Sequence, residues 1–158
     1  MPRILILTGH PASGKTSLIK QPIFDDWIKL DIEVLMKGCD LSRDSDPRIY
    51  TELRREVFNN LFKGRDVCIE LLGTERFFSH FRELCWKSSF RLIEVELQKV
   101  SLSVALDSMI TRQDSMVDLQ GLRSMYGIKL NPNASLFFTT QNTMLDFNRF
   151  ERLLKGEK

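Results

Sequence analysis

One stretch decides the fold of this chain: Gly9-His10-Pro11-Ala12-Ser13-Gly14-Lys15-Thr16. It matches the pattern G-x-x-x-x-G-K-[ST], in which successive backbone N–H groups surround a phosphate. The residues before it, Ile4 to Thr8, form a short apolar run that is typical of a buried strand. The residues after it, Ser13 to Gln21, have a helical pattern that stops at Pro22. A strand that enters the loop and a helix that leaves it are the context this pattern requires, so the sequence predicts a phosphate-binding loop.

The residue types in the loop each have a physical reason. Gly9 lets the chain turn sharply after the strand, and Gly14 lets the backbone come close to a phosphate. The N-terminus of the following helix adds partial positive charge. Lys15 is predicted to face the β- and γ-phosphates of a nucleotide, and the Thr16 hydroxyl is predicted to be a Mg²⁺ ligand. We expect the nucleotide-binding residues to be Gly9, His10, Pro11, Ala12, Ser13, Gly14, Lys15, Thr16 and Ser17, with His10 shaping the loop rather than acting in catalysis.

Further along the chain, extended and helical patterns alternate. The predicted strands cover residues 26–30, 67–72, 90–97 and 136–140, and the predicted helices cover residues 47–62, 75–86, 101–110, 119–126 and 143–154. Strands separated by helices indicate βαβ units with right-handed crossovers. The sequence therefore predicts an α/β fold, a parallel sheet with helices on both faces and a short lid segment, in a single domain over residues 1–158.

Composition agrees with an ordinary globular protein. The 158 residues carry a formal net charge of +2, which is too small to indicate nucleic acid or membrane by itself. The three cysteines, Cys39, Cys68 and Cys85, form no CxxC pair, and we expect Cys68 to be a buried thiol. Neither a signal peptide nor a membrane span is recognisable. Reduced cysteines and the absence of these segments lead us to expect a cytoplasmic protein.

Acidic residues follow two of the predicted strands. Asp31 stands at the carboxyl end of the second strand, where open parallel sheets form a ligand crevice. Its carboxylate could accept a hydroxyl proton, hold a Mg²⁺-bound water or simply cap the next helix, and Glu33 is a neighbouring alternative. Glu70 closes the apolar run Val67-Cys68-Ile69, where an acid can orient the water shell of a metal ion or form a salt bridge in the crevice.

The remaining candidates for catalytic residues are arginines. Arg112 follows the helix predicted over residues 101–110 and opens a polar stretch. In small kinases a lid closes in this place and its arginine neutralises the transferring phosphate, although an arginine at a helix end also balances the helix dipole. Arg123 is a second candidate. We expect Arg76 and Arg82 to lie on a solvated helix face.

With these motifs in place, the chain resembles the P-loop kinase superfamily, and within it the kinase domain of phage-type polynucleotide 5′-hydroxyl kinases. The phosphate loop carries the resemblance, together with the segment from Leu106 to Arg112 and the segment from Leu119 to Tyr126, which resemble that family's lid and the helix after it. The resemblance implies that Lys15 and Thr16 bind ATP and Mg²⁺, that Asp31 is the general base and that Arg112 is a lid arginine.

The chain also departs from that family. It has Val34 where the family has an arginine three residues after its base, with Lys37 the nearest cation, and Met116 where the family has a second lid arginine. The stretch from Trp27 to Lys37 is similar in layout to small antibiotic O-phosphotransferases.

The sequence predicts an ATP-dependent kinase that transfers the γ-phosphate to a hydroxyl group, with GTP left open as a donor. A polynucleotide 5′-hydroxyl is favoured as the acceptor. One alternative is a nucleoside, a nucleotide or another small alcohol as the acceptor, and another is an NTP-binding regulatory module without phosphotransfer.

Overall fold

A computed structural model describes residues 1–9, 13–31, 47–70, 75–97, 103, 107, 133–137, 139–140, 143–144 and 146–157. The five strands of its main sheet lie in the order β2-β3-β1-β4-β5, and all neighbouring pairs are parallel. These strands are β1 (Arg3–Gly9), β2 (Ile28–Asp31), β3 (Val67–Glu70), β4 (Arg91–Leu97) and β5 (Ser135–Phe137). A separate antiparallel pair joins β6 (Thr139–Thr140) and β7 (Thr143–Met144).

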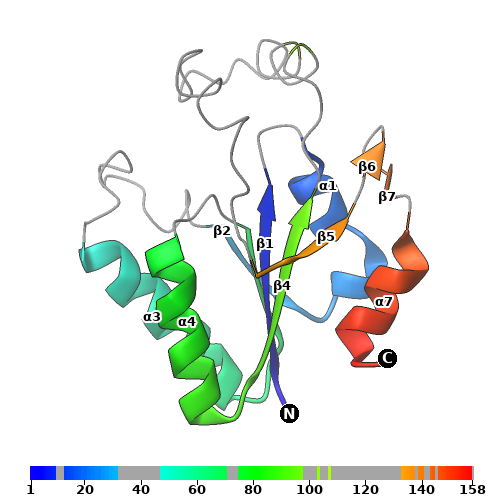
Figure 1. The fold of residues 1–158 in the computed structure, drawn as a ribbon. Helices are drawn as coiled ribbons and strands as arrows, with labels where there is room; N and C mark the ends of the chain where they lie inside the picture. The colour runs from blue at the N-terminus through cyan, green and yellow to red at the C-terminus, as the bar shows by residue number, and fades with distance from the viewer. Residues whose placement is uncertain are drawn as a thin grey trace.

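Helices cover both faces of the sheet, as the sequence predicts. In Figure 1, α3 and α4 lie on one side of the strands, and α1 and α7 lie on the other. The described helices are α1 (Lys15–Ile19), the 3-10 turn η1 (Pro22–Phe24), α3 (Pro47–Phe62), α4 (Glu75–Ser88) and α7 (Phe147–Lys155). The predicted α/β fold is therefore confirmed.

The alternation of side chains along β1 divides the core into two clusters, because successive residues of a strand point to opposite faces. Ile4 and Ile6 pack toward α3 and α4, whereas Leu5 and Leu7 pack toward α1 and α7. The first cluster also contains Leu53, Val57, Leu61, Val67, Ile69, Phe81 and Cys85. The second contains Leu18, Phe24, Trp27, Cys68, Ile93, Val95, Leu97, Phe137, Phe150 and Leu154. β1 is thus the central buried strand, and it delivers the phosphate loop from the middle of the sheet.

The two described cysteines lie in these clusters, so the prediction of a buried Cys68 is confirmed. Cys68 is 1% exposed and Cys85 is 2% exposed, and neither forms a disulfide. Burial raises the pKa of the Cys68 thiol, and the nearby Glu70 carboxylate adds to that rise. Burial, with a smaller effect of Glu94, raises the pKa of Cys85 to about 11. Both thiols are core groups rather than nucleophiles, because only the thiolate reacts.

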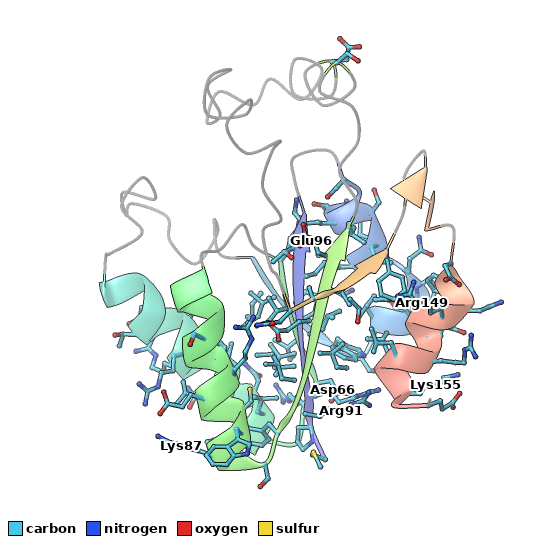
Figure 2. All side chains as sticks on the ribbon, viewed as in Figure 1. Asp66, Lys87, Arg91, Glu96, Arg149 and Lys155 are labelled. Carbon is cyan, nitrogen blue, oxygen red and sulfur yellow. The ribbon has the colours of Figure 1, made fainter. Side chains whose placement is uncertain are left out.

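Two arginines fix the amino end of the sheet to the C-terminal helix. Arg3 bonds the Asp66 carboxylate through its backbone N–H, at 2.7 Å, and also through its guanidinium. Arg3 and Arg91 donate to the Leu154 carbonyl oxygen at 3.0 and 3.1 Å, which satisfies a carbonyl at the end of α7. Figure 2 shows Asp66 and Arg91 at the end of the sheet opposite Glu96. Structural contacts stabilise this amino end of the sheet, and the candidate site lies at the opposite, carboxyl end.

Four sequence predictions need correction. The helix predicted over residues 143–154 begins only at Phe147, because β-branched Thr143 pairs with Thr140 in the β6–β7 hairpin. For the same reason the strand predicted over residues 136–140 is divided between β5 and β6. The regular helix after the loop is shorter than residues 13–21 and covers Lys15–Ile19. The fourth correction concerns Arg82, which forms an ion pair with Glu94 instead of lying on a solvated face.

Other predictions fall partly or wholly outside the described residues. Of the helix predicted over residues 101–110, only Ser103 and Asp107 are described, and both are helical. The helix predicted over residues 119–126 lies outside the described residues. Within the part of the chain that is described, no helix combines the length and apolarity needed to cross a membrane.

Candidate functional site

The phosphate loop lies at the carboxyl end of β1, between the two halves of the sheet. β3 and β2 extend the sheet on one side of β1, and β4 and β5 extend it on the other. Ligands of open α/β sheets bind outside the carboxyl ends of the strands at the point where the strand order reverses. The loop that begins at Gly9 and ends at the start of α1 occupies that point. Residues 10–12 of the predicted nucleotide-binding set lie outside the described residues.

Two glycines give the loop its shape. Gly14, immediately before α1, has a φ of 94°, a left-handed conformation that side chains with a Cβ rarely adopt. Gly9 is confined for a different reason: a Cβ there would lie 2.3 Å from Ser13 Oγ and 3.3 Å from Leu97 Cβ. Ser13 is itself buried at 1% exposure. Ser13 therefore packs closely against Gly9 at the end of β1.

Gly9→Ala is expected to lower nucleotide affinity at least tenfold and to cost about 1–3 kcal/mol of unfolding free energy, because the added methyl overpacks the loop against Ser13. Chemical denaturation and nucleotide titration measure the two effects. Gly64→Ala is the matched control, since Gly64 has a φ of 76° with open space around it. It should lose about 1–2 kcal/mol through backbone strain while nucleotide affinity stays at the wild-type value. Wild-type affinity in Gly9→Ala would contradict the close packing.

The Lys15 side chain turns back toward Gly9 at the end of β1. Its Nζ donates a hydrogen bond to the Gly9 carbonyl oxygen at 2.7 Å, so the first and seventh residues of the motif are joined directly. This bond holds the ammonium group above the end of β1, where the loop N–H groups of this motif surround a phosphate. The positive charge is thus positioned by the backbone of the loop.

Thr16 and Glu70 meet across the crevice. The Thr16 hydroxyl donates to Glu70 Oε1 at 2.8 Å, and this contact is exposed at the surface. The alternation along β3 explains the meeting: Ile69 packs toward α3 and α4 and Cys68 toward α1, so Glu70 falls on the α1 side as well. The structure therefore brings together the two residues predicted to serve a metal ion.

Asp31 occupies the neighbouring position of the sheet. It is the last residue of β2, and its Cα is in register with that of Glu70 at the end of β3. Adjacent strands lie about 4.8 Å apart, so two acidic positions stand side by side at the carboxyl edge. The described part of Asp31 is its backbone. Glu33, Lys37, Arg112 and Arg123 lie outside the described residues.

The oxygen groups at this edge suit Mg²⁺. A hydroxyl and a carboxylate are hard oxygen donors, and Mg²⁺ is usually held by one or two such protein groups together with substrate phosphates and waters. Among the described residues, no group of three or more His, Cys, Asp or Glu side chains could hold a metal ion by itself. The Thr16–Glu70 pair therefore fits a metal ion that arrives with a phosphate and does not fit a metal cage made of protein alone.

A buried glutamate near the loop was not predictable from the sequence. Glu96 is in register with Thr8, one residue before the end of β4, and it is only 4% exposed. Thr8 is also buried and donates to the Val95 carbonyl oxygen at 3.2 Å. Figure 2 shows Glu96 toward the carboxyl end of β4. Alternating glutamates in a strand usually mark a solvent-facing side, so the pattern Glu94-Val95-Glu96 gave no reason to expect burial.

Comparisons with solved structures support the same fold. No protein-family model matches the chain, and no curated protein matches it. A gluconokinase from Sinorhizobium meliloti is similar at 14% identity and a TM-score of 0.66, over 99% of this chain and 98% of that one. The APS kinase CysC of Mycobacterium tuberculosis, in complex with AMPPNP and APS, is similar at 16% identity and a TM-score of 0.64, over 98% of each chain.

A third similarity is to a chain of the Pnkp1/Rnl/Hen1 RNA repair complex, at 15% identity and a TM-score of 0.60, over 82% of this chain and 47% of that one. Identities this low establish the fold alone. With the observed strand order, they show an α/β fold like that of these solved kinases.

Proposed function

We propose that this protein is a kinase that transfers the γ-phosphate of ATP to a hydroxyl group, with a polynucleotide 5′-hydroxyl as the favoured acceptor. The observation that carries the proposal is the hydrogen bond between Thr16 and Glu70. It joins the phosphate loop to the end of β3 over an exposed surface, where a phosphate-bound metal ion could be reached by both. A glycine-rich turn without a ligand has no need of this pair.

In this proposal the loop and Lys15 bind the phosphates of ATP. The backbone N–H groups of the loop, which Pro11 alone lacks, and the Lys15 ammonium offset the charge of the β- and γ-phosphates. Thr16 would hold Mg²⁺ through its hydroxyl oxygen while its proton stays directed to Glu70, which would orient metal-bound water. When bound, Mg²⁺ neutralises charge on the phosphate oxygens.

Asp31 and Arg112 complete the proposed chemistry. The acceptor oxygen forms a bond to the γ-phosphorus while the bond from that phosphorus to the β–γ bridging oxygen breaks, and ADP leaves. The acceptor proton passes to the Asp31 carboxylate. Arg112 stabilises the charge on the transferring phosphoryl group, with Arg123 as the second candidate. The cytoplasm remains the predicted location.

Glu70→Gln is expected to raise the Mg²⁺ concentration at half-maximal rate roughly 10–100-fold, because the amide can still accept from Thr16 but loses its charge. Initial rates measured against Mg²⁺ concentration at saturating ATP test this. Glu83→Gln is the control, since Glu83 lies exposed on α4 and pairs with Lys87. If Glu70→Gln needs no more Mg²⁺ than wild type, Glu70 does not serve the metal ion and is only a hydrogen-bond partner of Thr16.

A small-molecule alcohol is the second candidate acceptor. The similar structures include a gluconokinase and a sugar kinase from Janibacter, which is the reason to keep this alternative acceptor, and the transfer step stays the same. Parallel assays with 5′-hydroxyl oligonucleotides, nucleosides, nucleoside monophosphates and sugars separate the two candidates. Selective labelling of the oligonucleotide supports the favoured acceptor, and selective labelling of a small alcohol replaces it.

A further inference from the structure

Three aromatic side chains cluster where α3 ends. The ring centroids of Phe58 and Phe62, one helical turn apart, are separated by 6.1 Å. Phe90, which comes just before β4, lies 5.9 Å from Phe58 and 5.2 Å from Phe62. Phe58 and Phe90 pack on the core cluster beneath α3 and α4, whereas Phe62 is 73% exposed. The two partly buried rings therefore hold a third ring that is open to solvent.

The same side of α3 also carries arginines. Residues three, four and seven apart share one side of a helix, so Arg54 and Arg55 lie on the side of Phe58 and Phe62. The fully apolar side of the helix is separate and is buried in the core. We call Arg54, Arg55, Phe58 and Phe62 the α3 stripe.

The charges around the α3 stripe are mostly positive and exposed. Between residues 51 and 65 the cations are Arg54, Arg55, Lys63 and Arg65, and the acids are Glu52 and Glu56. Of these cations, only Arg55 has an acidic partner among the described residues, in a pair with Glu52 at 2.6 Å. These two side chains are 60% and 45% exposed, and water screens a pair as open as this one. The surface therefore attracts an anionic ligand.

Exposed rings between cations are suited to single-stranded nucleic acid, because bases stack on the rings while the cations follow the phosphates. A second copy of this chain fits less well. A two-fold interface places the same patch on both subunits, and here it would bring like charges together.

We propose that the α3 stripe, with Lys63 and Arg65 beyond it, binds a stretch of single-stranded nucleic acid. As a surface for the favoured polynucleotide acceptor, the stripe rests on the proposed function, but the binding itself needs no ATP.

The test measures, without ATP, the binding of a fluorescent single-stranded oligonucleotide of about 12 nucleotides to the full chain. Fluorescence anisotropy is recorded at several salt concentrations for Phe62→Ala, which removes the exposed ring, and for Arg54→Gln/Arg65→Gln. Arg152→Gln/Lys155→Gln is the matched control, because it removes the same charge from exposed positions of α7, on the other side of the sheet (Figure 1). Melting curves show whether each variant is folded.

We expect Phe62→Ala to raise the Kd roughly 5–100-fold, the loss that follows removal of one stacking platform. Arg54→Gln/Arg65→Gln should weaken binding and reduce the slope of log Kd against log salt concentration by about one to two. The α7 control should keep the wild-type Kd and slope. A blunt duplex of the same length should bind more weakly than the single strand, because its bases are already stacked on one another.

Wild-type affinity in both stripe variants would overturn the proposal. Equal competition by an oligoglutamate of the same charge would also overturn it and would assign the surface to an acidic protein segment. A dimer, detected by light scattering, that Phe62→Ala dissociates would overturn it in favour of a second copy. If the stripe variants lose oligonucleotide binding but wild type labels no acceptor from ATP, the kinase function fails and the binding surface stands.

Discussion

Lys15→Ala is expected to lower turnover by about 10²–10³-fold, the loss that follows removal of one preorganised charge at a reacting centre. In the structure the Lys15 ammonium bonds the Gly9 carbonyl oxygen and belongs to neither apolar cluster. Its removal should therefore leave the thermal unfolding midpoint within a few degrees of wild type. Steady-state kinetics, nucleotide titration and a melting curve measure the three quantities on one preparation.

Lys20→Ala is the control for this variant. Lys20 follows the last residue of α1 and is exposed, so its loss removes the same charge from the same helix without touching the loop. It should keep wild-type turnover. Wild-type turnover in Lys15→Ala would show that the loop takes no part in the reaction.

Asp31→Asn is expected to lower turnover by about 10²–10⁴-fold while ATP binding stays intact, because the amide cannot accept the proton of the acceptor hydroxyl. The backbone places Asp31 beside Glu70 at the carboxyl edge, the position from which a carboxylate could reach an acceptor. A general base acts on the acceptor and makes no contact with the bound nucleotide, so KM for ATP should not change. Single-turnover transfer and ATP titration separate the two effects.

The matched control is Asp26→Asn, an exposed residue in the turn before β2. It removes the same charge five residues away and should keep wild-type activity. If Asp31→Asn keeps turnover within a factor of about three, Asp31 becomes a helix cap and Glu33 becomes the next candidate for the base.

The parts of the fold that local chemistry determines were predictable. The run from Ile4 to Leu7 is apolar throughout, and a strand buried on both faces needs that composition. The loop motif then indicated the position of the helix after it, because Gly14 permits the left-handed turn that leads from the loop into the helix. The pairing of the two acids was also predictable, because Asp31 and Glu70 each end a strand and parallel strands present their carboxyl ends on one edge of the sheet.

The parts that depend on contacts between elements or on a competing hairpin were not predictable. Arg82 has the spacing of an exposed helical residue, and only the packing of α4 against β4 reveals Glu94 opposite it. Thr143 falls within the helical pattern of the C-terminal segment, and only its pairing with Thr140 takes it out of the helix. At Arg82 the helix forms as predicted and only the contact with Glu94 takes the side chain out of water, whereas at Thr143 the hairpin pairing overrides the helical preference.

The transfer of label from ATP tests the kinase proposal most directly. The full chain, Mg²⁺ and an excess of a 5′-hydroxyl oligonucleotide are incubated in parallel with ATP labelled at the γ- or the α-phosphate. A kinase moves the γ-label onto the 5′ end and leaves the α-label in ADP, and Lys15→Ala should abolish the transfer. If neither the oligonucleotide nor any nucleoside, nucleotide or sugar takes up the γ-label while the protein still binds ATP through Lys15, the chain is a nucleotide-binding module and the proposed phosphotransfer is wrong.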